Sequence, residues 1–272
     1  MDRQEARSAI EMEQVTVIHG DTVALSDVTV DFPASTSTVV MGPSGCGKST
    51  LLKVAAGLIP PDRGRVCFRG MDVFTMTGRA EREFRRANGF VFQDGALWEN
   101  KTVAENLALP LEVHFESLHP SEVYRRVLHA LERVGLTAAA SHRPASLSSG
   151  ERKIVSLLRA LITEPSVVFL DEPTLSIDHS MSDRIRQMIH ELKARGCTII
   201  TVTEDPRLAS TLADRLVVLD AGLLLEAGDF DQVKRTRNAR ARSILSQVLG
   251  EIASYDTDLL GLLEGDESLP EN

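Results

Sequence analysis

The chain has 272 residues, 43% of them hydrophobic, which is enough to bury the core of one large or two modest domains. Its formal charge is −9, but seven acidic and no basic residues fall in 251–272, which leaves a charge of −2 for residues 1–250. Neither value is the excess of positive charge that a nucleic-acid-binding protein needs. No apolar run reaches the roughly 18 residues that span a bilayer, and the N-terminus lacks the apolar stretch of a signal peptide, so we expect a cytoplasmic protein.

Antiparallel strands are predicted near the N-terminus. Between residues 10 and 32 short apolar and polar patches alternate, and Gly20 and Asp21 between them are typical of a hairpin turn. Residues 1–9 are expected to form a leader ahead of this domain.

A glycine-rich loop then separates a β-branched run from an apolar helical stretch. Residues 42–49 match G-x-x-x-x-G-K-[ST], and a strand before with a helix after is the context that this motif requires. The glycines let the backbone bring its N–H groups to an anion at the N-terminus of a helix. Lys48 is expected to reach the β- and γ-phosphates of a nucleoside triphosphate, and the Ser49 hydroxyl to bind its Mg²⁺. The alternative is a glycine-rich turn that binds nothing. The expected nucleotide-binding residues are Gly42, Pro43, Ser44, Gly45, Cys46, Gly47, Lys48, Ser49 and Thr50.

A helical insertion is predicted in the middle of the chain. Residues 64–70 and 89–93 have the character of strands, and the charged stretch 79–87 between them that of a solvated helix. Residues 94–146 are mostly helical, with an apolar stripe at helical spacing in 121–135. We expect this helical lobe to interrupt an α/β domain.

Two carboxylates end the next apolar strand, whose sequence is VVFLDEP. Ligands of open α/β sheets bind at the carboxyl ends of strands. Asp171 is therefore expected to hold Mg²⁺ through water, and Glu172 to polarise the attacking water. Simple strand termination is the alternative. A helix over 178–196 and strands over 197–203, 214–220 and 222–228 complete the α/β pattern.

The C-terminal segment, 237–272, is expected to lie outside this domain. An amphipathic helix over 243–252 precedes the acidic tail, and no core for its apolar stripe is evident. We expect the stripe to pack on a neighbouring subunit, with docking inside its own subunit as the alternative. The stripe consists of Ile244, Leu245, Val248, Leu249 and Ile252.

Residues 147–151, LSSGE, lie between the two phosphate-site motifs and resemble the LSGGQ signature of ABC transporter ATPases. Gln93 in VFQD and Asp178 in LSID resemble the Q-loop and D-loop residues of that family, in the family's order. The likeness covers residues 10–230. It implies a P-loop ABC ATPase fold: α/β with a mixed sheet, an antiparallel β subdomain and a helical lobe at about 94–146, within a domain of 10–236.

The same resemblance implies ATP and Mg²⁺ as ligands and a transmembrane permease as partner. Gln93 would link Mg²⁺ to the permease, and Asp178 would lie beside the nucleotide. Two ATPase subunits, identical or different, would pair head to tail, so that Ser148 and Gly150 cap nucleotide held by the opposite subunit. Trp98 is expected to anchor the permease in a groove formed by about residues 93–123, the alternative being ordinary packing in the lobe.

Three positions depart from the family pattern. Ser149 and Glu151 replace a glycine and a glutamine of the signature and add bulk beside the phosphate. His19 stands where the family has an aromatic residue that stacks on adenine. Either its imidazole also stacks, covering less of the adenine surface than a tyrosine does, or it is a loop residue that does not contact the nucleotide. Glu204 stands where the family has the switch histidine that donates to the γ-phosphate, and a carboxylate there repels phosphate unless it is protonated or turned away.

Residues 91–114 also resemble the ATPases of Mla-type bacterial lipid transporters, which work with substrate-binding Mce proteins. This resemblance implies that the chain powers phospholipid movement from the cytoplasmic face of the inner membrane, without touching the lipid itself. A generic ABC importer or lipoprotein-exporter ATPase is the alternative. The likeness is carried by Phe92, Gln93, Gly95, Ala96, Leu97, Asn106, Pro110, Leu111 and His114.

Two functions remain open. In the first, the chain hydrolyses ATP to drive transport with Glu172 as base, at a rate that Glu204 slows. In the second, Glu204 has made it a degenerate regulatory subunit beside a second, competent ATPase. A DNA-repair ATPase is excluded because no sustained heptad separates Gln93 from Leu147.

Overall fold

The computed structural model describes residues 8–253, and their side chains as far as residue 247. The acidic tail and most of the expected leader lie outside these residues. So do the side chains of Val248, Leu249 and Ile252.

An antiparallel sheet forms the N-terminal part of the structure, with strand order β2-β1-β4-β5. His19 pairs with Thr22 across the hairpin turn, as the sequence predicts. The first strand begins at Ser8, two residues before the expected start of the domain. The strands are β1 (Ser8–His19), β2 (Thr22–Pro33), β4 (Arg63–Phe68) and β5 (Met71–Asp72).

The central sheet has six strands in the order β10-β9-β3-β8-β7-β6. All are parallel except β10, which pairs antiparallel with β9 at the edge. Every residue of β3, β7 and β8 is buried, as expected for central strands of a parallel sheet that is covered on both faces. Because these three strands are neighbours, the loops after their carboxyl ends meet. The strands are β3 (Ser37–Met41), β6 (Asn88–Val91), β7 (Val167–Asp171), β8 (Thr198–Val202), β9 (Arg215–Asp220) and β10 (Leu223–Asp229).

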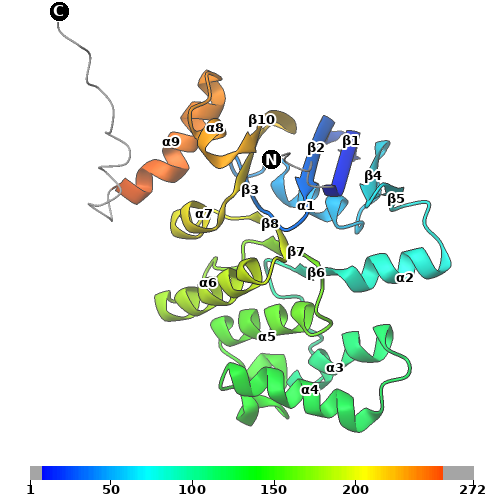
Figure 1. Cartoon of the computed structure of the whole chain (residues 1–272). Coiled ribbons are helices and arrows are strands. Elements are labelled where there is room, and N and C mark those ends of the chain that lie inside the picture. The colour runs from blue at the N-terminus through cyan, green and yellow to red at the C-terminus, as the bar shows by residue number, and fades with distance from the viewer. Residues whose placement is uncertain (1–7, 254–272) are drawn as a thin grey trace, which may run out of the picture.

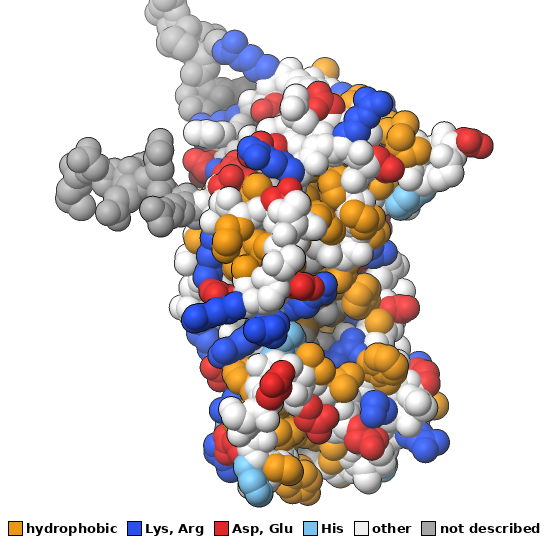
Figure 2. Space-filling model, turned by 90° about the vertical axis from the view of Figure 1, so that its right-hand side faces the viewer, with side chains coloured by type: hydrophobic (Ala, Val, Ile, Leu, Met, Phe, Trp, Pro, Cys, Tyr) orange, Lys and Arg blue, Asp and Glu red, His pale blue; other side chains and the backbone are white. Residues whose placement is uncertain are grey.

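The helical lobe of α3 and α4 extends from one end of the molecule, and α5 lies between this lobe and α6 (Figure 1). Helix α2 buries only Phe84, as expected for a solvated helix. Figure 2 shows basic side chains across the middle of the face that carries β4, β5 and α2. The helices are α1 (Lys48–Ala55), α2 (Gly78–Ala87), α3 (Val103–His114), α4 (Pro120–Arg133), α5 (Ser149–Leu161), α6 (His179–Ala194), α7 (Pro206–Leu212), α8 (Phe230–Lys234) and α9 (Ala239–Ala253), with 3-10 turns at Thr137–Ala139 and Pro144–Ser146.

The first turns of α9 pack inside their own chain, which corrects the expectation of a subunit contact for this part of the stripe. Ala241, Ile244 and Leu245 are at most 4% exposed, and they join a core cluster with Leu216 and Val218 of β9. The helix also begins at Ala239 rather than near residue 243. The physical reason is that α7, which the sequence pattern did not reveal, and β9 provide an apolar surface for it.

The observed architecture is the expected one, an α/β fold with a mixed sheet, an antiparallel sheet and a helical lobe. Within residues 8–253, none of the helices has the length and apolar character needed to cross a bilayer.

Candidate nucleotide-binding site

The loop between β3 and α1 approaches two other segments so closely that only glycine fits. A Cβ on Gly42 would collide with the carbonyl oxygen of Leu219, and one on Gly47 with that of Ala24. Gly47 also has φ of 107° and caps α1 without a side-chain hydrogen bond. The N–H of Leu51 donates to the carbonyl of Gly47 at 2.9 Å, and the N–H groups of Lys48, Ser49 and Thr50 before it are left to bind an anion.

Lys48 and Ser49 open α1 and point toward this loop and the end of β7. The Lys48 side chain is 7% exposed, and its Nζ donates to the carbonyl oxygens of Gly42 at 2.8 Å and Pro43 at 3.0 Å. The Ser49 hydroxyl donates to Oδ1 of Asp171 at 2.9 Å. A hydroxyl beside a carboxylate is a donor set that suits Mg²⁺, so these residues fit a magnesium nucleotide.

Glu172 follows Asp171 at the end of β7 and is 6% exposed. Its backbone has φ of 47°, a left-handed conformation that is uncommon for residues with a Cβ. Burial raises the pKa of Glu172, and the nearby charges of Glu204 and Asp171 act in the same direction. A raised pKa makes the carboxylate a better proton acceptor near neutral pH.

Glu204 lies beside Glu172 because β8 and β7 are neighbours. Its backbone N–H donates to Oε2 of Glu172 at 3.0 Å. Its carboxylate, 54% exposed, lies 3.9 Å from Nζ of Lys48. The position at which the family has its switch histidine is therefore at the site, and its side chain is turned toward the lysine.

Gln93 follows β6 and lines the same cavity as Ser49 and Asp171, with a volume of about 760 Å³. Ser149 of the signature segment and the buried Lys153 line it too. The structure thus places Gln93 on the cavity that Ser49 and Asp171 also line, and its role toward Mg²⁺ stays a prediction.

His19 is exposed at the end of β1, in the hairpin that packs against the phosphate loop. The carbonyl of Ala24, on the partner strand β2, lies against Gly47. The contact places this hairpin over one side of the loop, and adenine stacking by His19 stays a prediction.

The signature segment caps a helix. Ser148 is the N-cap residue of α5: its hydroxyl accepts from the N–H of Glu151 at 3.2 Å, and the Glu151 carboxylate accepts from the N–H of Ser148 at 2.8 Å. The Ser148 hydroxyl also donates to that carboxylate at 2.9 Å. These hydrogen bonds lower the pKa of Glu151, so the residue expected only to add bulk keeps a negative charge beside Ser148. The S-x-x-E spacing is the sequence signal for this capping box.

Asp178 also caps a helix. Its carboxylate accepts from the N–H of Met181 at 3.0 Å and from the hydroxyl of Ser180 at 2.7 Å, at the N-terminus of α6. Among the described residues, no hydrogen bond or ion pair joins Asp178 or Ser148 to Lys48 or Glu172. Within the described residues of one chain, hydrogen bonds and an ion pair therefore connect Ser49 with Asp171, Glu172 with Glu204, and Glu204 with Lys48, and Gln93 lines the same cavity as Ser49 and Asp171. Ser148, Gly150 and Asp178 lie outside these contacts.

Sequence reasoning missed Lys153, which belongs to this site. It is 8% exposed on α5, and its Nζ donates to the main-chain carbonyl of Glu172 at 2.7 Å. A lysine inside an amphipathic helix usually points to solvent, and the only signal was its place five residues after Ser148.

A family model described as ABC transporter matches residues 25–175, more than half of the chain. The methionine import ATP-binding protein MetN of Brucella abortus (strain 2308) is 35% identical over 241 residues, which cover 88% of this chain and 65% of that protein. The sulfate/thiosulfate import ATP-binding protein CysA of Photorhabdus laumondii is 34% identical over 269 residues, covering 97% of this chain and 72% of that protein. The chain thus spans less than two thirds of the length of MetN.

Solved structures agree with the fold. A dimeric ATP-binding cassette in a post-hydrolysis state, bound to ADP and Pi, has a TM-score of 0.75 and 29% identity, covering 81% of this chain and 98% of that one. An ATP-binding subunit of an ABC transporter has a TM-score of 0.75 and 25% identity, covering 90% and 100%. With its phosphate loop, signature and paired carboxylates in place, the chain belongs to the ABC transporter family, as an ATP-binding subunit.

Proposed function

We propose that this chain binds and hydrolyses ATP, with Mg²⁺, to power a membrane transporter. The observation that carries the proposal is the contact between the Ser49 hydroxyl and the Asp171 carboxylate, with the buried Glu172 next in sequence. A metal-binding pair and an adjacent carboxylate with raised pKa suit attack of water on a phosphate.

In this mechanism the loop N–H groups and Lys48 bind the phosphates, and Lys48 exchanges its carbonyl partners for phosphate oxygens. Ser49, Asp171 and Gln93 would hold Mg²⁺, which would supply positive charge to neutralise the phosphates. Glu172 orients the attacking water and accepts its proton. His19 stacks on the adenine, and Asp178 lies beside the nucleotide near the subunit boundary.

Two such subunits are proposed to close head to tail, and the dimeric state of the cassette to which the chain is similar supports pairing of two subunits. Ser148 and Gly150 of one subunit then cap the nucleotide of the other. Because the Ser148 hydroxyl is engaged by Glu151, its bond to phosphate requires that hydroxyl to turn away from the carboxylate.

Replacement of Glu172 by glutamine tests the catalytic assignment. The amide keeps the shape but does not accept the proton, so we expect normal ATP affinity, turnover reduced about 100-fold or more, and accumulation of the nucleotide-bound dimer. Glu132→Gln, on the exposed surface of α4, is the control. Turnover of Glu172→Gln at the wild-type rate, measured with the permease present, would refute the assignment.

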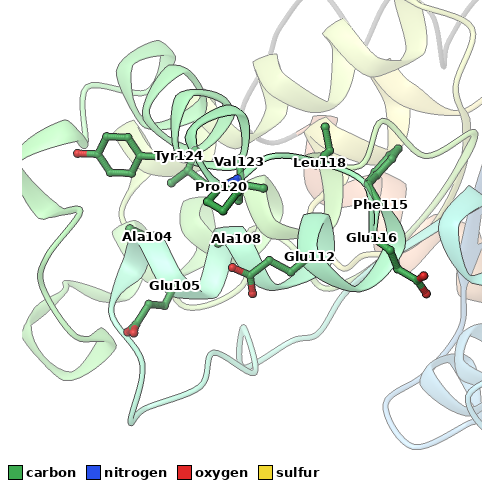
Figure 3. Close-up of a pocket in the computed structure, with 11 residues that line it drawn as sticks. Ala104, Glu105, Ala108, Glu112, Phe115, Glu116, Leu118, Pro120, Val123 and Tyr124 are labelled. Atoms are coloured by element: carbon green, nitrogen blue, oxygen red, sulfur yellow. The ribbon is translucent and has the colours of Figure 1, made fainter.

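A permease is proposed to dock on the lobe, where a groove of about 370 Å³ lies between α3 and α4 (Figure 3). Phe115, Leu118 and Val123 contribute apolar surface, and the exposed Glu105, Glu112 and Glu116 line the same groove. An amphipathic helix with basic residues matches this surface. Trp98, 53% exposed before α3, is a further anchor, and the chain would work peripherally at the cytoplasmic face of the inner membrane.

Glu204 favours a second candidate, in which the chain is a degenerate nucleotide-binding subunit beside a competent ATPase. Its carboxylate faces Lys48 at 3.9 Å, where the family has a donor to the γ-phosphate. If this candidate holds, silencing the partner ATPase stops transport more completely than Glu172→Gln does.

The transported substrate has two candidates, because the permease and its binding protein select it. The names of the relatives, methionine import and sulfate/thiosulfate import proteins, support import of a small solute. The Mla-like sequence of residues 91–114 supports phospholipid transport with a Mce-type protein. ATPase stimulation of the assembled transporter by solute-loaded binding protein, compared with stimulation by a phospholipid-loaded Mce protein, distinguishes the two.

A further inference from the structure

Lys153 is a buried cation in contact with the catalytic segment. Lysines are almost never fully buried without a partner, and the partner here is the carbonyl oxygen of Glu172, 2.7 Å from Nζ. Burial lowers the pKa of Lys153, while the carboxylates of Glu172 and Asp171 act against that effect. A hydrogen bond from a charged donor on α5 thus connects this helix to Glu172, the residue that follows β7.

The peptide that Lys153 contacts is held in an unfavourable conformation. Glu172 has φ of 47°, and residues in such conformations persist only where their surroundings fix them. The Glu172 N–H donates to the carbonyl of Val202 at 3.0 Å. On the carbonyl side, the Leu175 N–H contributes only a longer hydrogen bond of 3.3 Å, so Lys153 makes the shorter contact.

The conformation of this backbone sets the direction of the Glu172 side chain. Its carboxylate meets the N–H of Glu204 at 3.0 Å and lies at the end of β7 beside Asp171. If the Glu172 peptide rotated to an ordinary conformation, the Cα–Cβ bond would turn and the carboxylate would leave this position.

We propose that Lys153 is a positioning residue for ATP hydrolysis: its ammonium holds the Glu172 carbonyl and so keeps the Glu172 carboxylate aimed at the attacking water. The inference rests on the proposed role of Glu172 as base. Although Lys153 lines the same cavity as Ser49 and Asp171, its ammonium is directed to the Glu172 carbonyl, so we expect its loss to lower turnover and to leave nucleotide affinity intact.

The test compares Lys153→Met, which retains an unbranched apolar chain without a donor, with Lys153→Arg, which restores a charged donor. We measure kcat and KM of the assembled transporter, and equilibrium binding of a fluorescent ATP analogue. A lost hydrogen bond from a charged donor corresponds to roughly a 10- to 100-fold lower kcat in Lys153→Met. We expect unchanged affinity for the analogue and a partial recovery of kcat in Lys153→Arg.

Lys193→Met is the matched control. Lys193 of α6 also donates to a main-chain carbonyl, that of Leu212 at 2.6 Å, and its ammonium pairs with Asp214. Asp214 lies at the amino end of β3, where it accepts from the N–H of Ser37, whereas the phosphate loop follows the carboxyl end of that strand. Loss of Lys193 should lower the melting temperature without lowering kcat. If Lys153→Met alters kcat no more than Lys193→Met does, the inference is wrong.

The activities of Glu172→Gln and Lys153→Met test the proposed base and the positioning role separately. Full activity of Glu172→Gln would refute the proposed base, whereas a stalled Glu172→Gln with a fully active Lys153→Met would refute only the positioning role. A crystal structure of Lys153→Met gives an answer independent of turnover. Glu172 with a changed φ and a displaced carboxylate supports the inference, and an unchanged Glu172 overturns it.

Discussion

The ammonium of Lys48 lies 3.9 Å from Oε1 of Glu204. In the proposed function this ammonium binds the γ-phosphate of ATP. Lys48 is almost fully buried and Glu204 is half exposed, so the phosphate and the Glu204 carboxylate compete for the same cation. Removal of the Glu204 carboxylate should therefore leave Lys48 free to bind phosphate.

Glu204→His should raise turnover. It removes a repulsive charge and supplies a donor, and a single aligned donor to developing charge is worth about 10²-fold in rate. We expect an increase of at least roughly 10-fold, measured as steady-state ATPase activity. Glu204→Gln, which removes only the charge, serves as control and should mainly tighten ATP binding. The gain should vanish when Glu172→Gln is added, and no gain from Glu204→His would show that another group already fills the switch role.

Lys48→Ala should abolish stabilisation by ATP. A ligand at 100 times its Kd stabilises the native state by about 2.7 kcal/mol, which for a chain of this size raises the Tm on the order of 5 to 10 °C. We expect that rise in the wild type and in Lys234→Ala on α8, and none in Lys48→Ala. Thermal unfolding with and without Mg²⁺ and ATP checks it. An equal rise in Lys48→Ala would remove the phosphate role of this lysine.

Substitutions of Asn106 and Trp98 should have different effects: Asn106→Ala should lower the free energy of unfolding, and Trp98→Ala should weaken permease binding. Asn106 is fully buried: its Oδ1 accepts from the N–H of Trp98 at 2.8 Å, and its amide donates to the carbonyls of Trp98 and Thr102. Asn106→Ala leaves buried polar groups unpaired and should lower the free energy of unfolding, measured in urea, by about 2 to 4 kcal/mol.

Trp98→Ala removes an exposed ring, so its free energy of unfolding should stay within about 0.5 kcal/mol of the wild-type value, yet the variant should lose the permease in a pull-down. Full permease binding by Trp98→Ala would exclude the ring from the interface.

Charge reversal at the groove should slow permease association. Glu112→Lys with Glu116→Lys replaces two exposed acids along the groove with bases, and such changes act mainly on the association rate. We expect a loss of roughly 10-fold at low salt that shrinks as salt rises. Glu132→Lys, which does not line the groove, is the control. Equal association rates for all three proteins would place the permease elsewhere.

The start of α9 should contribute to the stability of the single chain. Leu245 is 3% exposed against the core cluster of β9, and Leu→Ala changes in cores cost about 2 to 5 kcal/mol. A chain that ends at Arg242 should therefore unfold at lower urea concentration than one that ends at Ala253. Identical unfolding midpoints would restore the view that this stripe serves a neighbouring subunit.

The sequence by itself determined the parts of the site that depend on local backbone chemistry. The phosphate loop is recognisable because its glycines, Lys48 and Ser49 act within one turn between a strand and a helix. The apolar sequence before Asp171 likewise predicts a buried strand that ends in two carboxylates. The capping box of Ser148 and Glu151 was also readable from its spacing, although it was not anticipated.

Only the tertiary structure decided which distant residues meet. Ser49 and Asp171 are 122 positions apart, and Glu172 and Glu204 are 32 apart, so their contacts depend on the strand order β3-β8-β7, which no local pattern encodes. The same holds for Lys153, whose burial results from the packing of α5 on the sheet, and for Ile244 and Leu245, whose core is built by β9 and α7. An amphipathic pattern specifies that a face will be buried, but the surface that buries it exists only once the chain has folded.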